Sequence, residues 1–593
     1  MSQYKTTDIR NIALIGHAGA GKTSLTEALL HRAGTIPARG ELSRGTTVCD
    51  YDPQERAMQH SINPALCHFN HKNHRINILD TPGYPDLLGR SISVLSAVET
   101  GVLVINSQQG IELGTRRMME AAKRGKLCRM IVVNKIDEGI GNIDQLVAEI
   151  QEIFGAECLP LNLPTEGGAA VEDCYFNDSG QPTVVSSVEE AHQQVIDQVV
   201  EVDESLMEDY LESGKEPSPG KLHDAFEKAL REGHLIPICF TSAETGVGIT
   251  KLLEIFSQLA PNPLEGNPPA FVKGEGSDAK PVELSTDPNA HAIARVFKIA
   301  IDPYLGKLGI FRIHQGTIKS GGQLFVGDHR KPIKVAHLYN VQGKDMVEVP
   351  HGIPGDICAI SKIDELFYDA VLHDSHDEDN YHLKSIKLTP PMLGLALLPK
   401  NRGDEQKLSD ALHKLIAEDP SLRLEHDASA NETVMFGMGD LHLRIVLERM
   451  KDQMNVEVET SPPTVPYRET ITRKADGHHR HKKQTGGAGQ FGEVYLSVEP
   501  LERGEGFEFQ NKVVGGTIPG QFIPAVEKGV RSAIDGGAIA GFPLQDIRVT
   551  VHEGKHHPVD SKEIAFVAAG RKAFLDAVGK AGAWSDSGVS GLS

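Results

Sequence analysis

The chain contains few of the features that mark exported or membrane-bound proteins. No apolar run approaches the ~18 residues needed to cross a bilayer, so we expect no membrane partner. The first ten residues, MSQYKTTDIR, lack the apolar core of a signal peptide, so we expect no export signal. The seven cysteines are odd in number and form no CxxC pair. This argues against a disulfide framework or a zinc ribbon and favours a reducing cytoplasm.

Positive charge is also scarce. The formal net charge is −21, whereas proteins that bind nucleic acid are usually basic, so any RNA contact must come from a local patch. Hydrophobic residues make up 39% of the chain and charged residues 24%, which is typical of a globular protein. With 593 residues the chain is expected to form several domains, since single cores stop growing near ~250–300 residues.

A phosphate-binding loop follows the first predicted strand. Residues 11–15 (NIALI) indicate a buried parallel strand, the next eight match GxxxxGK[ST], and the helical stretch SLTEALLHRA follows. This context disfavours a chance glycine-rich turn. Backbone N–H groups of such a loop surround phosphate oxygens, while Lys22 reaches the β- and γ-phosphates and the Thr23 hydroxyl binds Mg²⁺. The predicted residues are Gly16, His17, Ala18, Gly19, Ala20, Gly21, Lys22 and Thr23.

A second motif comes after the predicted strand 76–79. It consists of Asp80, Thr81, Pro82 and Gly83. Asp80 is positioned to hold Mg²⁺ through water, and the Gly83 N–H to meet the γ-phosphate. Such a DxxG match is weak alone, but it gains weight from its place after a strand.

Two further motifs select the base. The predicted strand 129–133 delivers Asn134, Lys135, Ile136 and Asp137. The Asp137 carboxylate can accept hydrogen bonds from the N1–H and 2-amino groups of guanine, which adenine lacks, so Asp137 disfavours an ATP-using protein. The strand 236–240 leads to Ser242 and Ala243, whose amides are predicted to cap guanine O6. All four motifs end strands, where doubly wound sheets bind ligands. The sequence therefore predicts binding of GTP or GDP with Mg²⁺.

Beyond these motifs, the chain resembles the translational GTPases, and most closely elongation factor G, over about residues 9–583. The resemblance is carried by the segments PHGIPGDI, GMGDLHLRI, HKKQTGGAGQFGEV, GGTIPGQFIPAVEKG and HPVDSKEIAF, together with the nucleotide motifs. It implies a monomeric, cytoplasmic GTP hydrolase, an elongation factor of protein biosynthesis, that acts on the ribosome. Whether it would serve translocation, ribosome recycling or ribosome protection stays open.

The resemblance also implies a multidomain α/β and α+β fold. It predicts a P-loop GTPase domain at 1–265 with an insert at about 158–232, a β-barrel domain at 266–385, a ferredoxin-like domain at 386–462 and an α+β domain at 463–583. Short alternating strands in 288–380 and a strand, helix, strand, strand, helix, strand order in 386–462 agree with this. Residues 584–593 match nothing in the family and are expected to be a disordered or frame-shifted tail, so we expect no fifth domain.

Three positions depart from the family pattern. Tyr84 stands where the family has a His that positions the attacking water; a phenol is a poor general base but can hydrogen-bond a water. Ser61 is the best match for the switch I hydroxyl that binds Mg²⁺, and Gly19 replaces a usual Asp. The predicted catalytic residues are thus Lys22, Gly83 and Tyr84, and the predicted metal ligands are Thr23, Ser61 and Asp80.

The fourth predicted domain carries a basic run at 473–483. By itself a charge run is most often a solvated face. The resemblance instead implies an arm that reaches the decoding site and contacts rRNA, tRNA and mRNA, with glycines allowing close approach to phosphates. The implied contact residues are Lys482, Lys483, Gly486, Gly487, Gly489, Gln490 and His557.

Two questions stay open from the sequence. The acidic, His-rich stretch 373–382 (HDSHDEDNYH) is either a solvated loop or, less favoured, a metal-binding tract. The function is either GTP hydrolysis on the ribosome or GTP-dependent ribosome binding with little turnover, the latter motivated by Tyr84 and by the expected lack of a fifth domain. A truncated, inactive product is the third alternative.

Overall fold

The computed structural model describes residues 4–274, 276, 279–302, 304–384, 386–401, 403–427, 430–465, 467–483, 489–582 and 584–586. They form two compact units, one within 1–425 and 433–461 and the other within 426–432 and 462–593. Over the described residues, every helix is too short or too polar to span a bilayer.

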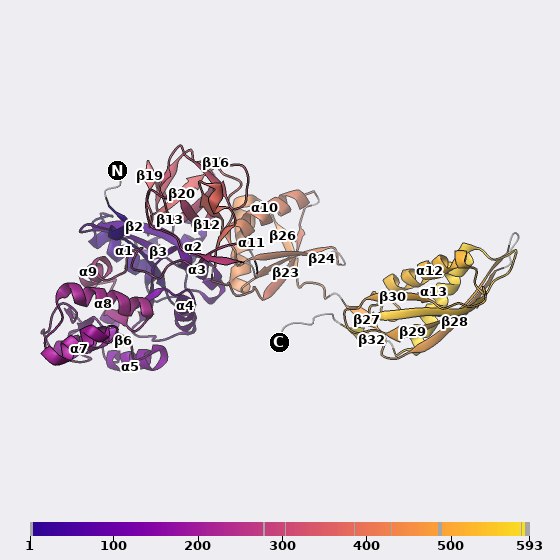
Figure 1. The fold of residues 1–593 in the computed structure, drawn as a ribbon, viewed down its shortest axis with the longest axis horizontal. Helices are drawn as coiled ribbons and strands as arrows, with labels where there is room; N and C mark the ends of the chain where they lie inside the picture. Colours follow the sequence, from indigo (N-terminus) through magenta and orange to yellow (C-terminus); the bar gives the residue numbers. More distant parts are fainter. Residues whose placement is uncertain are drawn as a thin grey trace. The chain divides into compact units, whose positions relative to one another are not determined.

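The first domain of the first unit is built on a seven-stranded sheet in the order β2-β3-β1-β4-β5-β9-β6 (Figure 1). All neighbours are parallel except β2 and β3. The strands are β1 (Ile9–Ile15), β2 (Ala65–His71), β3 (His74–Asp80), β4 (Thr100–Asn106), β5 (Cys128–Asn134), β6 (Cys158–Pro160) and β9 (Ile236–Phe240). The larger helices around it are α1 (Lys22–Arg32), α4 (Leu113–Arg124), α5 (Ile143–Phe154) and α9 (Ile249–Gln258).

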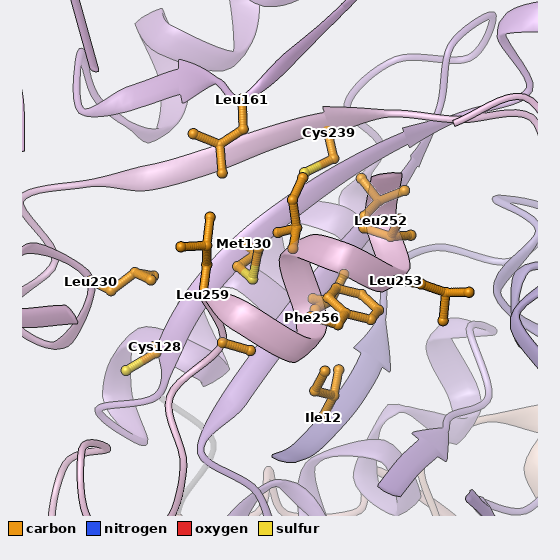
Figure 2. Packing of buried hydrophobic residues seen from close by; sticks show 14 of the residues in the cluster. Ile12, Cys128, Met130, Leu161, Leu230, Cys239, Leu252, Leu253, Phe256 and Leu259 are labelled. Atoms are coloured by element: carbon orange, nitrogen blue, oxygen red, sulfur yellow. The ribbon is translucent and has the colours of Figure 1, made fainter. Parts of the chain in front are cut away.

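Both faces of this sheet are covered, which explains why every residue of β1 and β4 is buried and why most of them are apolar. Ile12 and Leu14 belong to one core cluster, whereas Ala13 and Ile15 belong to another. Neighbouring side chains of a strand point to opposite faces, so a continuous apolar run fits a sheet buried on both sides. Figure 2 shows the first cluster, in which Phe256 of α9 packs near Ile12.

The predicted insert forms a group of helices, coloured magenta in Figure 1, whose apolar side chains join the core on one face of the main sheet. They are α6 (Val188–Val200), α7 (Glu204–Ser213) and α8 (Pro219–Glu232), preceded by the hairpin of β7 (Asn162–Pro164) and β8 (Val171–Asp173). The first three residues expected in the insert instead extend the main sheet, since β6 pairs in parallel with β9. A three-residue strand gives too little periodicity to be recognised in the sequence.

The second domain is an antiparallel β-barrel domain. Its main sheet has the order β16-β15-β21-β12-β13-β20-β17-β18. These strands are β12 (Ile293–Asp302), β13 (Gly306–Gln315), β15 (Gln323–Val326), β16 (Ile333–Lys334), β17 (Leu338–Gln342), β18 (Asp345–Val349), β20 (Ile357–Ser361) and β21 (Val371–His373). A smaller sheet joins β10 (Phe271–Lys273), β11 (Lys280–Val282) and β22 (Tyr381–Leu383), and β14 (Ile318–Lys319) pairs with β19 (His351–Gly352).

The third domain has the predicted ferredoxin-like order. It runs β23 (Leu393–Pro399), α10 (Glu405–Glu418), β24 (Arg423–Asp427), β25 (Glu432–Gly437), α11 (Asp440–Met454) and β26 (Val458–Ser461), with the sheet order β24-β25-β23-β26. The apolar faces of both helices pack into one core, with Leu408, Leu412, Leu443 and Met450 all buried. Their spacing is that of a helix face turned toward a core, so these residues are structural.

The second unit is an α+β domain. Its sheet, in the order β28-β29-β31-β30, consists of β28 (Ala475–Lys483), β29 (Gln490–Pro500), β30 (Phe507–Asn511) and β31 (Ile547–Lys555). The helices α12 (Ile523–Gly536) and α13 (Glu563–Lys580) share its core. The expectation of a disordered tail from residue 584 is wrong for its first three residues. Trp584–Asp586 form β32, which pairs with β27 (Arg468–Thr470), a long-range pairing that local sequence does not reveal.

Candidate functional site: a guanine-nucleotide pocket

The predicted phosphate loop connects β1 to α1. Gly21, the residue before α1, has a φ of +86°, and a Cβ there would overlap the side-chain amide of Asn134, so glycine is required. Lys22 is buried, and its Nζ donates to the carbonyls of Gly16 (3.0 Å) and His17 (2.7 Å). Burial lowers the pKa of Lys22, and the nearby Asp80 charge opposes that shift. The lysine is thus held at the loop, facing the position that phosphate anions take in this motif.

The DTPG segment lies directly against this loop. The Thr81 hydroxyl donates to Leu14 O at 2.7 Å, which fixes the segment to β1. A Cβ on Gly83 would overlap Lys22 Nζ and lie 2.6 Å from the Ala18 nitrogen. Because no side chain fits, the Gly83 backbone can approach a phosphate bound in the loop.

The three predicted metal ligands meet at one point. The Thr23 hydroxyl donates to Asp80 Oδ2 at 2.6 Å and lies 3.0 Å from Ser61 Oγ. Asp80 is 1% exposed, and its Oδ1 has no hydrogen-bond partner within the described part of the chain. Two hydroxyls and a buried carboxylate with an unsatisfied oxygen suit a hard divalent cation such as Mg²⁺.

A second carboxylate, which the sequence did not point to, borders this cluster. Asp50 is buried, and within the described ranges neither of its carboxylate oxygens has a hydrogen-bond partner. Burial raises the pKa of Asp80, and the Asp50 charge raises it further. A bound cation would relieve this repulsion. Asp50 belongs to none of the recognised motifs, so only its position in the fold reveals it.

The segment predicted to be switch I folds around Ser61. The short helix α2 (Pro53–Met58) is capped by Asp52, and Glu55 accepts hydrogen bonds from the amides of Ile62 (3.0 Å) and Asn63 (2.9 Å). Burial raises the pKa of Glu55 to about 7, although these amides oppose the shift. The Glu55 side chain therefore fixes the backbone immediately after the predicted metal ligand.

The predicted base-reading residues are joined to the phosphate loop by Asn134. Its Nδ2 donates to Ala20 O at 3.1 Å, and its Oδ1 accepts from the Ala243 amide at 3.0 Å. Asp137 is exposed within the short helix η5 (Ile136–Glu138), where it can accept from a base. The Ser242 amide donates to Val247 O at 2.9 Å. The Ser242 amide thus bonds within its own loop and the Ala243 amide bonds to Asn134, and capping of guanine O6 stays a prediction.

Tyr84 does not stand alone beside the phosphate loop. Its ring packs against His60, with centroids 4.3 Å apart and planes tilted by 44°. Tyr84 is 36% exposed, so part of the residue reaches solvent. His60 is a residue that sequence reasoning missed, and the available signal was its place immediately before Ser61.

The segments that follow Ser61 and the DTPG motif both contact the third domain through hydrogen bonds. Arg90, in α3 (Leu88–Ser93), donates to Asn63 Oδ1 at 3.0 Å and through Nε to Asp419 Oδ2 at 2.5 Å. His442 Nε2 lies 2.8 Å from the same carboxylate oxygen. Burial would raise the pKa of Asp419, but Arg90 and His442 together hold it well below its usual range. Asp86, after the DTPG segment, accepts from the Leu441 amide at 2.9 Å.

The predicted RNA-contact residues gather at one end of the sheet in the second unit. Lys483 pairs with Gln490 across β28 and β29, and Lys482 with Phe491. The Phe491 amide donates to Asp560 O at 2.9 Å, which brings the loop of His557 to the same end. Gly489 lies there as well, since a Cβ on it would sit 2.8 Å from Asp560 Oδ1. Gly486 and Gly487 lie outside the described residues.

The rest of the basic run is largely offset by acidic neighbours. Lys474 pairs with Glu499, and His478 lies 2.9 Å from Glu493. Lys482 and Lys483 are exposed at the end of β28. Two exposed lysines therefore lie at the end where the predicted contact residues meet.

Family models match four parts of the chain. They describe the elongation factor Tu GTP-binding domain at 7–262, elongation factor G domain 2 at 291–370, elongation factor G domain III at 388–462 and elongation factor G domain IV at 463–582. An elongation factor G-like protein of Mycobacterium tuberculosis (strain CDC 1551 / Oshkosh) is 35% identical over 597 residues, covering 96% of this chain and 83% of the relative. The chain belongs to the elongation factor G-like family.

Other matches agree with this membership. The elongation factor G-like protein of Mycobacterium tuberculosis strain H37Rv is likewise 35% identical over 597 residues, covering 96% of this chain and 83% of the relative. A crystal structure of a Thermus thermophilus protein matches with a TM-score of 0.81 and 34% identity, covering 98% of this chain and 86% of that one. This elongation factor G-like chain thus carries a GTP-binding domain of the translational GTPase type.

Proposed function

We propose that this elongation factor G-like protein hydrolyses GTP in a Mg²⁺-dependent reaction coupled to ribosome binding. One observation carries the proposal. Thr23, Ser61 and Asp80 converge beside Lys22 and Gly83, and the switch that supplies Ser61 is hydrogen-bonded to the third domain through Arg90. A site built only to hold a nucleotide would not need this connection.

The reaction is in-line attack of water on the γ-phosphate. Lys22 stabilises the charge on the β- and γ-phosphate oxygens, and the Gly83 amide donates to the γ-phosphate. Mg²⁺, held by Thr23, Ser61 and Asp80, would neutralise charge on the same phosphates. Asp137 selects guanine because its carboxylate would be left without donors by adenine.

The water is positioned by a pair of rings in place of one histidine. The Tyr84 hydroxyl orients the attacking water, and His60 holds the Tyr84 ring in place. A neutral phenol takes up a proton far less readily than imidazole, so intrinsic turnover is slow.

The experiment measures GTP hydrolysis with and without purified ribosomes, alongside co-sedimentation in a non-hydrolysable GTP analogue. Ribosome-stimulated hydrolysis supports the proposal, and Lys22→Ala should abolish it. If the protein pellets with ribosomes in the presence of the analogue but neither ribosomes nor Tyr84→His produces turnover, it is a GTP-dependent binding factor. Tyr84 is the observation that favours this second function. Nucleotide binding without any response to ribosomes would refute both.

A further inference from the structure

The sequence leaves open whether the tract 373–382 is a solvated loop or a metal site. In the structure the tract forms short elements of secondary structure. It contains the end of β21, the short helix η7 (His376–Glu378) and the start of β22. Ser375 caps η7, since its hydroxyl accepts from the Asp377 amide at 3.2 Å. Glu378 is thereby turned back toward Asp374, and its amide donates to Ser375 O at 3.3 Å.

Several polar groups of the tract have partners of their own. His373 Nε2 lies 2.9 Å from Gly327 O, and its Nδ1 lies 2.7 Å from Ser375 O. His376 pairs with Asp379 at 3.1 Å. These side chains are therefore already engaged, whereas Asp374 and Glu378 both approach a single residue that lies outside the tract.

That residue is His291, just before β12. Since β12 and β21 are antiparallel and Ile293 pairs with His373, the chain places His291 beside the residues after β21. Asp374 Oδ1 accepts from the Ala292 amide at 2.9 Å and lies 3.2 Å from His291 Nδ1. Ligand atoms of His291, Asp374 and Glu378 all lie within 4.8 Å of one another.

The burial of Glu378 distinguishes this cluster from an ordinary surface ion pair. A salt bridge between His291 and Asp374 alone would need no third group. Yet Glu378 is only 8% exposed, and its Oε2 is buried with no hydrogen-bond partner among the residues the structure describes. An unsatisfied buried carboxylate oxygen is costly, and a cation at this position would satisfy it.

We propose that His291, Asp374 and Glu378 form a binding site for a divalent transition-metal ion such as Zn²⁺. One imidazole nitrogen with two carboxylate oxygens suits Zn²⁺, whereas Mg²⁺ and Ca²⁺ prefer oxygen ligands alone. Metal–ligand bonds of about 2.0–2.2 Å place ligand atoms about 3–3.5 Å apart. The exposed His291 side chain can supply the small movement this requires, and water would complete the coordination. The metal would tie the start of β12 to the tract and is independent of the GTP site.

Titration of the full chain with Co²⁺ tests the site. Co²⁺ occupies sites that suit Zn²⁺, and when it is bound through imidazole it absorbs visible light. Excess Mg²⁺ and GDP are present to occupy the nucleotide site. We expect one equivalent of Co²⁺ to bind, displaced by Zn²⁺, and His291→Asn, Asp374→Asn and Glu378→Gln each to weaken binding at least about ten-fold. His291→Asn is the most informative of the three variants, since this exposed side chain can be replaced without loss of core packing.

His376→Asn is the matched control, because it removes an imidazole of the same tract that lies outside the cluster. It should leave Co²⁺ binding unchanged. Equal affinity in the parent and His291→Asn, equal loss in His376→Asn, or no binding at millimolar Co²⁺ would each overturn the proposal. GTP hydrolysis plays no part in this readout, so failure of the proposed function would not affect it.

Discussion

The hydroxyl oxygens of Thr23 and Ser61 lie 3.0 Å apart although 38 positions separate the two residues in the chain. Thr23 belongs to the phosphate loop, and Ser61 to a segment that matches the family pattern only loosely. Their contact, with Asp80 Oδ2 2.6 Å from Thr23 Oγ1, is the geometric support for Ser61 as a switch I ligand.

Removing the Ser61 hydroxyl should weaken Mg²⁺-dependent GTP binding. Ser61→Ala deletes one ligand oxygen, at a cost on the order of ten-fold in affinity, whereas Ser61→Thr keeps it. Fluorescent GTP-analogue titrations at varied Mg²⁺ concentration measure the effect. GDP affinity should change little, because switch I contacts follow the γ-phosphate. Equal GTP affinity in Ser61→Ala and Ser61→Thr would remove Ser61 from the ligand set.

Base selection should depend on Asp137. In Asp137→Asn the carboxylate becomes an amide, which suits the 2-oxo group of xanthine instead of the 2-amino group of guanine. Competition between GTP and xanthosine triphosphate should therefore shift toward the latter, by at least about ten-fold. Glu138→Gln is the matched control, as an exposed neighbouring carboxylate. Unchanged GTP preference would show that another group reads the base.

We expect the packed rings of Tyr84 and His60 to limit the rate of GTP hydrolysis. Tyr84→His introduces a group that can take up a proton near neutral pH, so hydrolysis should rise by on the order of ten-fold or more. His60→Ala should lower the rate several-fold, since ring packing contributes about 0.5–1.5 kcal/mol. Single-turnover hydrolysis separates both effects from nucleotide binding. A Tyr84→His protein no faster than the parent would mean that another step limits turnover.

The buried network at Asp419 should stabilise the first unit. Asp419→Asn leaves the Arg90 guanidinium without its charged partner, and breaking a buried pair costs about 3–5 kcal/mol. The thermal unfolding midpoint should fall by several degrees. Lys400→Ala breaks the exposed pair with Glu457 and should have no measurable effect. Similar unfolding midpoints for the two variants would show that the Asp419 network does not stabilise the first unit.

Glu55 should make stability depend on pH. Its folded pKa of about 7 exceeds the ordinary value of 4.5, so the folded state binds the proton more tightly. The resulting stabilisation is complete below about pH 4.5 and is lost as the pH rises through about 7. Between pH 6 and pH 8 the loss amounts to about 1 kcal/mol. Unfolding of the nucleotide-free protein at both pH values measures it, and Glu55→Gln should flatten the difference. Parallel pH profiles would exclude Glu55 as the source.

Local patterns predicted much of this molecule because they are set by neighbouring residues. The buried strands of the first domain read as apolar runs, and the helices of the third domain as apolar faces with helical spacing. The phosphate loop was recognisable because its glycines and Lys22 occur at fixed spacing between a strand and a helix.

The contacts that sequence reasoning missed join distant residues. Arg90 and Asp419 are 329 positions apart, and His291 and Asp374 are 83 apart. Local sequence periodicity does not indicate such pairs, since they depend on how domains and strands pack. Asp50 and His60 were missed for a related reason, because each matters only through what folds against it.

The single amide of Asn134 has a further consequence. Because one side chain holds both Ala20 of the phosphate loop and Ala243 of the base-reading loop, the two halves of the pocket share a common support. We therefore expect recognition of the nucleobase and binding of the phosphates to be thermodynamically linked. Ordering of one half would favour ordering of the other, so that the affinity for a whole nucleotide would exceed what its two parts contribute separately.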